Sequence, residues 1–567
     1  MFREIFTAWH NWFHIIDNQH IMSLLIASFL STIVTLWLCF HFRRKLSFNK
    51  SEISVLLFLT VLVLWSVLSD FPFGGTVSRI GIVLSVFFLL KVIYGKIPTL
   101  FHSASTVMLW IGLAEILYAT ACSRNEATGI RGHFDNPAGF AAFLIMILPY
   151  CFLLIGSRNR YKRWTGLGIL AVFVTGLILS ESRAGIVSVL FVISIILYQR
   201  YRDFTRSKQS PKFRIGFLTA SLILLTTIFT ALYFQKKASA NGRLLIWRAS
   251  MELLREKPIS GHGAGSFQAL YMPSQAKFLG NHQDHPLSFL ADNTKHPFNE
   301  YLGALIQYGI LGFLALGCIA LLFYKQIRAV HLSPVKRCAL LSLTALAVFS
   351  LFSYPLYYYA ILCLVGIDLF ILSNQQHTSF GHVPIWILTL ISIPVSSWAV
   401  LYTAKQLQMT SKWEICMKEY PHSTNRPAII SLYSELYLKK NFYDPLFLYN
   451  YGAVLNNESL YHQSIQVLNH CRKIYDDADV QIIQADNFYQ IGNYQAAEQH
   501  AVQAAQMCPN RFLPLYYLWK IFQKNGRKQE AIAIAEVIVQ KPIKVENIEI
   551  RKIKLIMQKF LLQENDS

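Results

Sequence analysis

The chain has 567 residues, of which 54% are hydrophobic, 14% aromatic and only 15% charged, and its mean hydropathy is positive. This composition excludes an ordinary soluble enzyme and a disordered chain, and it indicates a polytopic membrane protein. The formal net charge of +21 does not indicate a nucleic-acid partner, because most of the basic excess lies in short connections between apolar runs.

Residues 1–20 are aromatic and amphipathic, and we expect them to lie on the membrane surface rather than to cross it. The runs that follow approach the length of about 20 apolar residues that crosses a bilayer, and we expect about twelve spans. These spans are near residues 21–40, 53–70, 77–94, 104–121, 137–156, 164–180, 184–199, 215–234, 298–323, 338–353, 355–373 and 383–403. The predicted fold class is therefore all-α.

Basic residues predict the orientation of these spans. Lys and Arg concentrate in the connections 41–50, 157–163, 200–214 and 324–337. The positive-inside rule places these connections in the cytoplasm. By parity, the segments that face outward are 122–136, 181–183, the long loop 235–297 and everything after residue 404.

We expect a transmembrane domain over residues 21–403 and an outward-facing domain over residues 404–567. In the second domain, Tyr461, Tyr494 and Lys528 begin similar segments at spacings of 33 and 34. This period is typical of tetratricopeptide repeats, whose helix pairs stack into a solenoid with a concave surface. The repeats are expected to bind a protein partner or to pack against the rest of the chain.

The long loop is cationic on the side where the positive-inside rule disfavours basic residues, so an anionic ligand is expected there. It ends in KHPFNEYL, which puts His296 and Pro297 at the predicted start of an apolar helix. A helix N-terminus favours the neutral imidazole, which is the form that acts as a base. Asn299 and Glu300 follow in the first turn, and Glu300 is placed to hold the ring of His296. Taken alone, the motif also fits an interfacial histidine without a catalytic role.

Three arginines on the expected outer face are candidates for binding an anion, because guanidinium groups bind phosphate oxygens through two parallel hydrogen bonds. Arg183 follows Ser182 in a tight turn, and Arg243 and Arg248 lie in the long loop. The alternatives are snorkelling to the interface for Arg183 and a solvated helix face for the other two. Asn136 precedes Pro137, which predicts mainly a helix start and secondarily a substrate contact.

Other features carry less functional information. The stretch GHGAGSF at 261–267 lacks both the preceding strand and the following Lys-Ser/Thr of a nucleotide loop, so its glycines are expected to allow tight turns. Glu115 and Asp368 lie in expected spans, where an ionisable group usually faces a cavity or a partner. The nine cysteines show no metal-ligand spacing, so no metal is expected.

Four motifs occur in order on the expected outer face. They are TGIRGHFDNPAGF before the fifth span, SESRAG between the sixth and seventh, NGRLLIWRASMELLREKPISGHGAGSF in the long loop, and KHPFNEYL at its end. This combination resembles the O-antigen ligase and polymerase family of polytopic glycan transferases, which includes bacterial protein O-oligosaccharyltransferases. The chain departs from the family pattern at Phe298, where the family often has a second histidine, so the role of the base falls to His296.

The resemblance implies a glycosyltransferase, without cofactor or metal, in the bacterial inner membrane. Such enzymes transfer a glycan from an undecaprenyl diphosphate carrier to an acceptor hydroxyl on the periplasmic face. The implied roles are His296 as general base, Arg183, Arg243 and Arg248 on the diphosphate, and Asn136, Asn299 and Glu300 in support. The acceptor stays open among a lipid A-core sugar, another carrier-linked glycan and a protein Ser or Thr.

Two other classes of protein also fit a polytopic chain with a basic outer loop. A transporter for a lipid-linked glycan would move its substrate unaltered. A scaffold that gathers envelope enzymes through the repeats would not need His296.

Overall fold

A computed structural model of the chain describes most of its length. The described residues are 28–41, 45–49, 74–94, 100–122, 129–204, 233–282, 285–328, 332–374, 381–439 and 444–565, with isolated positions between 52 and 63 and between 216 and 231. The expected interfacial segment 1–20 lies outside them, as do much of the expected spans 53–70 and 215–234.

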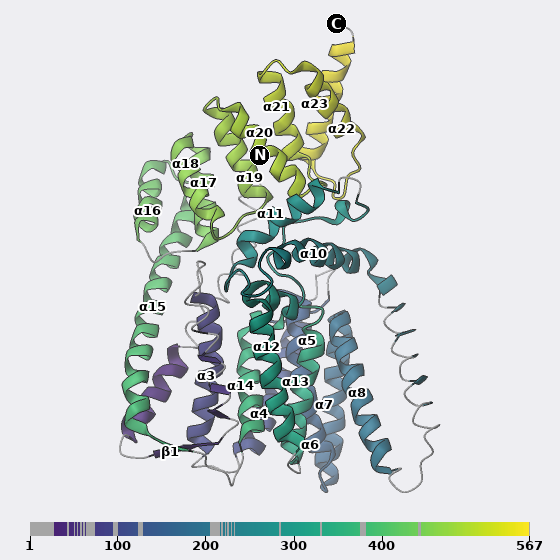
Figure 1. Ribbon diagram of the computed structural model, residues 1–567, viewed down its shortest axis with the longest axis vertical. Helices are drawn as coiled ribbons and strands as arrows, with labels where there is room; N and C mark the ends of the chain where they lie inside the picture. Colours follow the sequence, from purple (N-terminus) through teal and green to yellow (C-terminus); the bar gives the residue numbers. More distant parts are fainter. Residues whose placement is uncertain are drawn as a thin grey trace.

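Apolar helices lie side by side in the membrane part of the chain (Figure 1). Their bounds are α3 Gly74–Tyr94, α4 Leu100–Cys122, α5 Pro137–Ile147, η1 Leu148–Tyr150, α6 Cys151–Ile155, α7 Arg160–Leu179, α8 Arg183–Phe204, α12 Glu300–Arg328, α13 Pro334–Phe349, η3 Pro355–Tyr357, α14 Tyr359–Ser373 and α15 Ile385–Glu419. Among the described residues, five helices are long and apolar enough to cross a membrane, and four further apolar helices are shorter. A predominantly helical membrane protein is therefore confirmed, whereas the number of twelve spans stays a prediction.

The start of α5 is the one predicted from the sequence. Asn136 is the N-cap and Pro137 the first helical residue, and the Asn136 side chain accepts a hydrogen bond from the Gly139 N–H at 2.9 Å. This bond satisfies one of the free N–H groups at the helix N-terminus. A fully buried core that includes Phe140, Phe173 and Phe349 surrounds α5.

The start of α12 differs from the prediction. Pro297 was expected at the first helical position, but the helix begins at Glu300. Phe298 has a φ of 51°, in the left-handed region, so an α-helix cannot run through it. Asn299 instead accepts a hydrogen bond from the Leu302 N–H at 3.0 Å, as an N-cap does. His296 therefore lies in the loop before the helix and outside its first turn.

A small two-stranded sheet was not predicted. Strand β1 Lys45–Phe48 pairs antiparallel with β2 Gly381–Pro384, beneath α3 in Figure 1. The sheet joins two connections that are far apart in the sequence. No other strand occurs among the residues that the structure describes.

Helices α10 Lys237–Glu256 and α11 Phe267–Gly280, with the short η2 Ser288–Leu290, lie across one end of the membrane helices (Figure 1). We call this end the loop side. A cluster of buried apolar residues joins α10, α11 and α12 to the C-terminal part of the chain. It includes Ala249, Tyr271, Ile306 and Met507. The long loop is thus a packed layer.

The glycine-rich stretch 261–267 packs against a break in α12. The N–H groups of His262 and Gly263 donate to the carbonyl oxygens of Ile306 and Gln307, at 2.8 and 2.9 Å. At the break, Gly309 has a φ of 64°. Gly261, Gly263 and Gly265 also have positive φ values, so the expected tight turns are confirmed.

The final part of the chain is a stack of helices. Their bounds are α16 Arg426–Leu438, α17 Pro445–Asn457, α18 Tyr461–Arg472, α19 Ala478–Gln490, α20 Tyr494–Met507, α21 Leu513–Lys524, α22 Lys528–Gln540 and α23 Ile548–Asn565. Helices α18, α20 and α22 begin at the three positions predicted to be equivalent, and each packs against the helix before it. The assignment to tetratricopeptide repeats stays a prediction. Helix α15 runs without a break through residue 404, so the two parts of the chain share one helix.

Candidate functional site

The ring of His296 is held between tyrosines. It stacks on Tyr354 with a centroid distance of 4.1 Å and meets Tyr357 edge-on at 4.8 Å. Phe298 lies edge-on to Tyr354 at 5.1 Å. We call these four residues the His296 cluster. Neither ring nitrogen of His296 makes a hydrogen bond to a described residue.

Asn136 fixes the tyrosines to the start of α5. Its amide donates to the hydroxyl groups of Tyr354 and Tyr358, at 2.9 and 2.6 Å. Tyr358 in turn donates to the Asp135 carboxylate at 2.6 Å. Burial raises the pKa of Asp135, an effect that this hydrogen bond opposes. Asn136 therefore acts both as a helix cap and as an anchor for the surface on which His296 stacks.

Helix α10 brings Arg243 to the cluster. The Trp247 indole N–H donates to the Pro297 carbonyl at 3.0 Å, which joins α10 to the segment that carries His296. The Arg243 guanidinium lies 5.5 Å from the centre of the Phe298 ring. Burial lowers the pKa of Arg243 to about 10, and the charge of Arg183 contributes to this shift. Arg183 and Arg243 are thus close enough to interact electrostatically.

The remaining arginines differ in their contacts. Arg183 donates to the Lys236 carbonyl at 3.1 Å and to the Ser239 hydroxyl at 2.9 Å. Arg248 lies five residues after Arg243 on α10, which turns it about 140° around the helix axis. Its Nη1 is 3.1 Å from Nε2 of His285. Arg243 therefore reaches the His296 cluster, Arg183 lies near Arg243, and Arg248 contacts His285 instead.

The sequence suggested that Glu300 holds the ring of His296, but the carboxylate bonds elsewhere. Its carboxylate accepts a hydrogen bond from the Leu356 N–H at 2.9 Å, and its own N–H donates to the Ser350 carbonyl at 2.9 Å. Both bonds reach the connection between α13 and α14. Glu300 supports the segment that carries the tyrosines, and Asn299 caps α12.

Four residues of the site were not predicted from the sequence: Arg79, Tyr354, Tyr357 and Tyr358. The signal for the tyrosines was present in SYPLYYY at 353–359, a dense aromatic run between two spans. The signal for Arg79 was an isolated cation in an apolar helix, which usually marks a functional position in a membrane protein. The Arg79 guanidinium lies 4.8 Å from the centre of the Tyr357 ring.

Electrostatics keep His296 neutral. Burial lowers its pKa to about 3, and the charges of Arg79 and Lys295 add to the shift. The ring is therefore uncharged at neutral pH, which is the form that accepts a proton. It is also a weaker base than an ordinary histidine, unless a negative charge comes close and raises the pKa again.

The other ionisable candidates belong to separate contacts. Glu115 accepts hydrogen bonds from the backbone N–H of His133, at 2.8 Å, and pairs with its Nδ1, also at 2.8 Å. Asp368 is buried and bonded to the Tyr150 hydroxyl. Neither residue shares a described contact with the His296 cluster.

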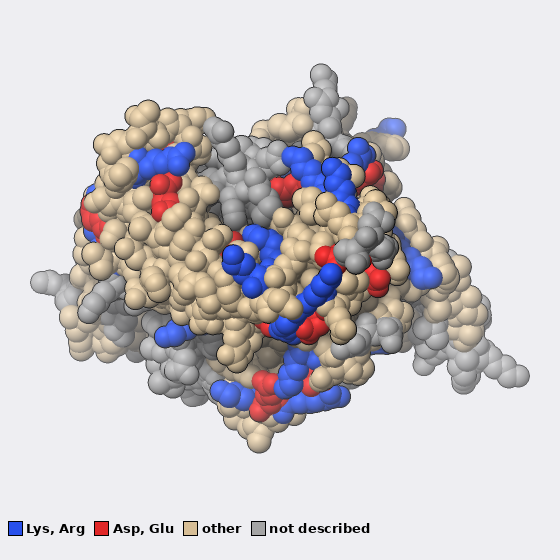
Figure 2. Space-filling model, turned by 90° about the horizontal axis from the view of Figure 1, so that it is seen from above, with Lys and Arg blue, Asp and Glu red and all other residues tan. Residues whose placement is uncertain are grey.

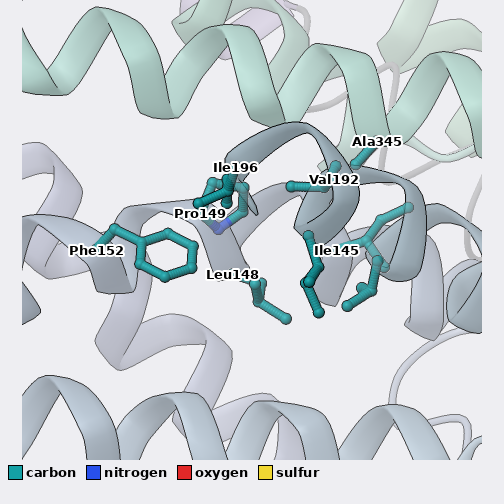
Figure 3. Close-up of a pocket in the computed structure, with 9 residues that line it drawn as sticks. Ile145, Leu148, Pro149, Phe152, Val192, Ile196 and Ala345 are labelled. Atoms are coloured by element: carbon teal, nitrogen blue, oxygen red, sulfur yellow. The ribbon is translucent and has the colours of Figure 1, made fainter. Parts of the chain in front are cut away.

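A small pocket lies among the membrane helices, as Figure 3 shows. It is lined by Ile145, Leu148, Pro149, Phe152, Val189, Val192, Ile193, Ile196 and Ala345. These side chains come from α5, η1, α6, α8 and α13, and all of them are apolar. The pocket has no lining residue in common with the His296 cluster and no group that could perform acid–base chemistry.

Seen from the loop side, Lys and Arg side chains lie close to Asp and Glu side chains on several parts of the surface (Figure 2). Asp292, for example, pairs with Arg511 at 3.4 Å and with Lys544 at 3.7 Å. Arg243 and Arg79 have no ion pair with any described carboxylate. Arg243 and Arg79 therefore lack the close ion pairs that surface cations such as Arg511 form.

Comparison with known proteins supports a relationship to glycan transferases. Residues 168–317 match the O-antigen ligase family, a range that contains Arg183, Arg243, Arg248, His296, Asn299 and Glu300. The chain is also 24% identical over 255 residues to a general O-oligosaccharyltransferase of Acinetobacter baylyi (strain ATCC 33305 / BD413 / ADP1). That match covers 41% of this chain and 42% of the relative, so the chain spans less than half of the relative's length. The predicted resemblance to the O-antigen ligase family is thus confirmed, through the domain at residues 168–317.

Proposed function

We propose that this chain transfers a glycan from a polyprenyl diphosphate carrier to an acceptor hydroxyl on the periplasmic face of the bacterial inner membrane. The observation that carries the proposal is a neutral histidine whose ring nitrogens make no hydrogen bond to a described residue, close to Arg243, in a segment that matches the O-antigen ligase family. A base and an anion-binding group side by side suit the transfer of a group from a diphosphate.

In the proposed reaction, the acceptor oxygen attacks the anomeric carbon of the glycan. The bond between that carbon and the diphosphate oxygen breaks, and its electron pair stays on the diphosphate. A ring nitrogen of His296 takes the proton of the acceptor hydroxyl. Arg183 and Arg243 stabilise the charge on the leaving diphosphate. No metal or cofactor takes part in these steps.

The supporting residues act through position. Asn136 holds Tyr354 beneath His296, Asn299 sets the start of α12, and Glu300 holds the connection that carries the tyrosines. Arg248 stays a predicted ligand of the diphosphate, and its contact with His285 makes it the weakest of the three arginine assignments.

The acceptor has a favoured class. The curated relative is named a general O-oligosaccharyltransferase, which favours a protein hydroxyl over a lipid A-core sugar. The helices after residue 426 pack directly on the long loop, and stacked helix pairs commonly bind peptides. A ligase that acts on lipid A-core or a polymerase that acts on a second carrier-linked glycan would use the same chemistry.

The envelope glycans of a deletion strain test the function and select the acceptor. Loss of glycan from periplasmic proteins, with lipopolysaccharide unchanged, is the expected result. Loss of capped lipopolysaccharide would indicate a ligase, and shortened chains would indicate a polymerase. A strain in which all three kinds of glycan are unchanged, and carrier-linked glycan does not accumulate, would contradict glycan transfer.

A further inference from the structure

Arg79 lies inside an apolar membrane helix, and its side chain reaches the His296 cluster. It is the sixth residue of α3 Gly74–Tyr94, at the end opposite Lys91. Its guanidinium carbon is 4.8 Å from the centre of the Tyr357 ring. The Tyr357 ring in turn lies edge-on to the ring of His296, with 4.8 Å between the two ring centroids. One tyrosine therefore separates the guanidinium from the histidine.

Arg79 lacks the partners that the other cation of the same helix has. Lys91 pairs with the buried Glu52 carboxylate at 2.6 Å. The Nε of Arg79 is buried and has no hydrogen-bond partner among the described residues, and no described carboxylate forms an ion pair with it. A charge in a membrane helix is costly unless a counter-charge compensates it. At the other end of the same helix, the Glu52 carboxylate compensates the charge of Lys91.

Two carboxylates lie in this region, Asp135 and Glu300. Asp135 accepts the hydrogen bond from Tyr358. Glu300 is near enough to Arg79 for the two charges to interact, but it forms no ion pair with it. Its Oε1 accepts the hydrogen bond from the Leu356 N–H. The contact with Tyr357 compensates Arg79 only in part, because a cation–π contact contributes about 1 kcal/mol, whereas a buried charge costs more. The guanidinium is therefore placed to meet an anion that comes with the substrate.

We propose that Arg79 binds the diphosphate of the carrier together with Arg243, the two guanidinium groups reaching the His296 cluster through different rings, Tyr357 and Phe298. This inference rests on the proposed function and adds a ligand to it. Of the arginines predicted to bind the diphosphate, Arg248 contacts His285, whereas Arg79, which was not predicted, contacts a ring of the His296 cluster. A planar guanidinium can bridge oxygens of both phosphates, which a monophosphate does not offer.

The test measures binding alone, without transfer. The full chain is placed in nanodiscs of phosphatidylcholine, and the affinities for polyprenyl diphosphate and polyprenyl monophosphate are compared. Arg79→Gln should weaken binding of the diphosphate by about tenfold to a hundredfold, as expected for the loss of charged hydrogen bonds. It should change binding of the monophosphate much less. Arg79→Lys keeps the charge without the planar fork, so it should lose less affinity for the diphosphate than Arg79→Gln. It replaces the glutamine variant in the test if that variant does not fold.

Arg255→Gln is the matched control. Arg255 lies on the solvent-exposed face of α10, paired with Glu252 at 2.7 Å, and its loss should leave both affinities unchanged. Wild-type affinity for the diphosphate in both Arg79 variants would overturn the inference, as would a loss that appears only with anionic phosphatidylglycerol in the nanodisc. That second result would assign Arg79 to lipid headgroups. Failure of the wild-type chain to bind polyprenyl diphosphate would overturn the proposed donor itself, which separates the two claims.

Discussion

His296 is a buried ring with positive charges close to it. Two tyrosines fix its ring, while Arg79 and Lys295 oppose its protonation. The histidine is therefore neutral in the absence of substrate. A bound diphosphate would bring negative charge beside these cations and would raise the pKa of His296 toward its usual value of about 6.5.

This coupling predicts a pH dependence. Protonated His296 cannot accept a proton, so the rate falls as pH drops through its pKa. The acid limb of kcat/KM reports the free enzyme and that of kcat the donor complex. Because the donor raises the pKa, the acid limb of kcat should lie at the higher pH of the two. Between pH 4 and 8, kcat should show an acid limb and kcat/KM should not, because the pKa of His296 in the free enzyme is about 3; the titration of the donor phosphates is measured separately. The reverse order would contradict the assigned environment of His296.

The arginines predict a graded loss of activity. Arg243→Ala and Arg183→Ala should each lower kcat/KM by on the order of a hundredfold, as for the loss of a group that stabilises developing charge. Lys at either position should restore activity only partly, since an ammonium lacks the planar fork. Arg248→Ala should have the smallest effect of the three, because its side chain contacts His285. Near-normal transfer by both Arg183→Ala and Arg243→Ala, assayed with purified enzyme, would place the diphosphate elsewhere.

At the scale of elements, the broken helix α12 positions the long loop. The carbonyl groups of Pro258 and Ile259 accept hydrogen bonds from the N–H groups of Ile310 and Leu311, at 2.9 and 3.3 Å. A Cβ on Gly309 would collide with the Ile259 carbonyl. Close backbone contact of this kind requires glycine, and it ties the loop that carries Arg243 to the helix that follows His296.

Gly309→Ala should therefore destabilise the chain by about 3 kcal/mol or more, since it combines a positive φ with a backbone clash. Gly492→Ala is the matched control, because Gly492 also has a positive φ, of 80°, but open space around the added Cβ. Its cost should be about 1 kcal/mol. Thermal unfolding in detergent measures both. Equal destabilisation by the two substitutions would mean that the contact between the loop and α12 does not exist.

The sequence was a good guide to elements with local signals. The N-cap at Asn136 followed from its side-chain chemistry, and the starts of α18, α20 and α22 followed from the repeat spacing. The start of α12 was misplaced because nothing local revealed the left-handed Phe298. The environment of His296 was not predictable, since Tyr354, Tyr357 and Arg79 reach it from distant parts of the chain through tertiary packing.

At the scale of the whole molecule, the helices after residue 477 pack against the long loop. Asn293 donates to Asp477 and Asp479 at 3.0 and 2.7 Å, and the Asn510 amide donates to the Ala291 carbonyl at 2.7 Å. Lys295, next to His296, lies over the Tyr475 ring at 5.4 Å. These helices therefore support the segment that carries the proposed base.

This packing links the location of the C-terminus to the location of the site. If the basic connections are cytoplasmic, the end of the chain and His296 are both periplasmic. A reporter that is active only in the periplasm, fused after Ser567, should be active, and a cytoplasmic reporter at the same position should be inactive. The opposite pair of results would put the proposed site on the wrong face of the membrane for the reaction.

The central claim is that His296 removes the proton of the acceptor hydroxyl. The most direct measurement is transfer by the purified full chain from a carrier-linked glycan to an acceptor, with donor binding measured in parallel. His296→Ala and His296→Gln should abolish transfer and leave donor affinity within a few-fold of wild type, because the arginines rather than the histidine hold the diphosphate. Substantial turnover by His296→Ala would contradict the claim and would direct the search for the base to His285 and Glu300.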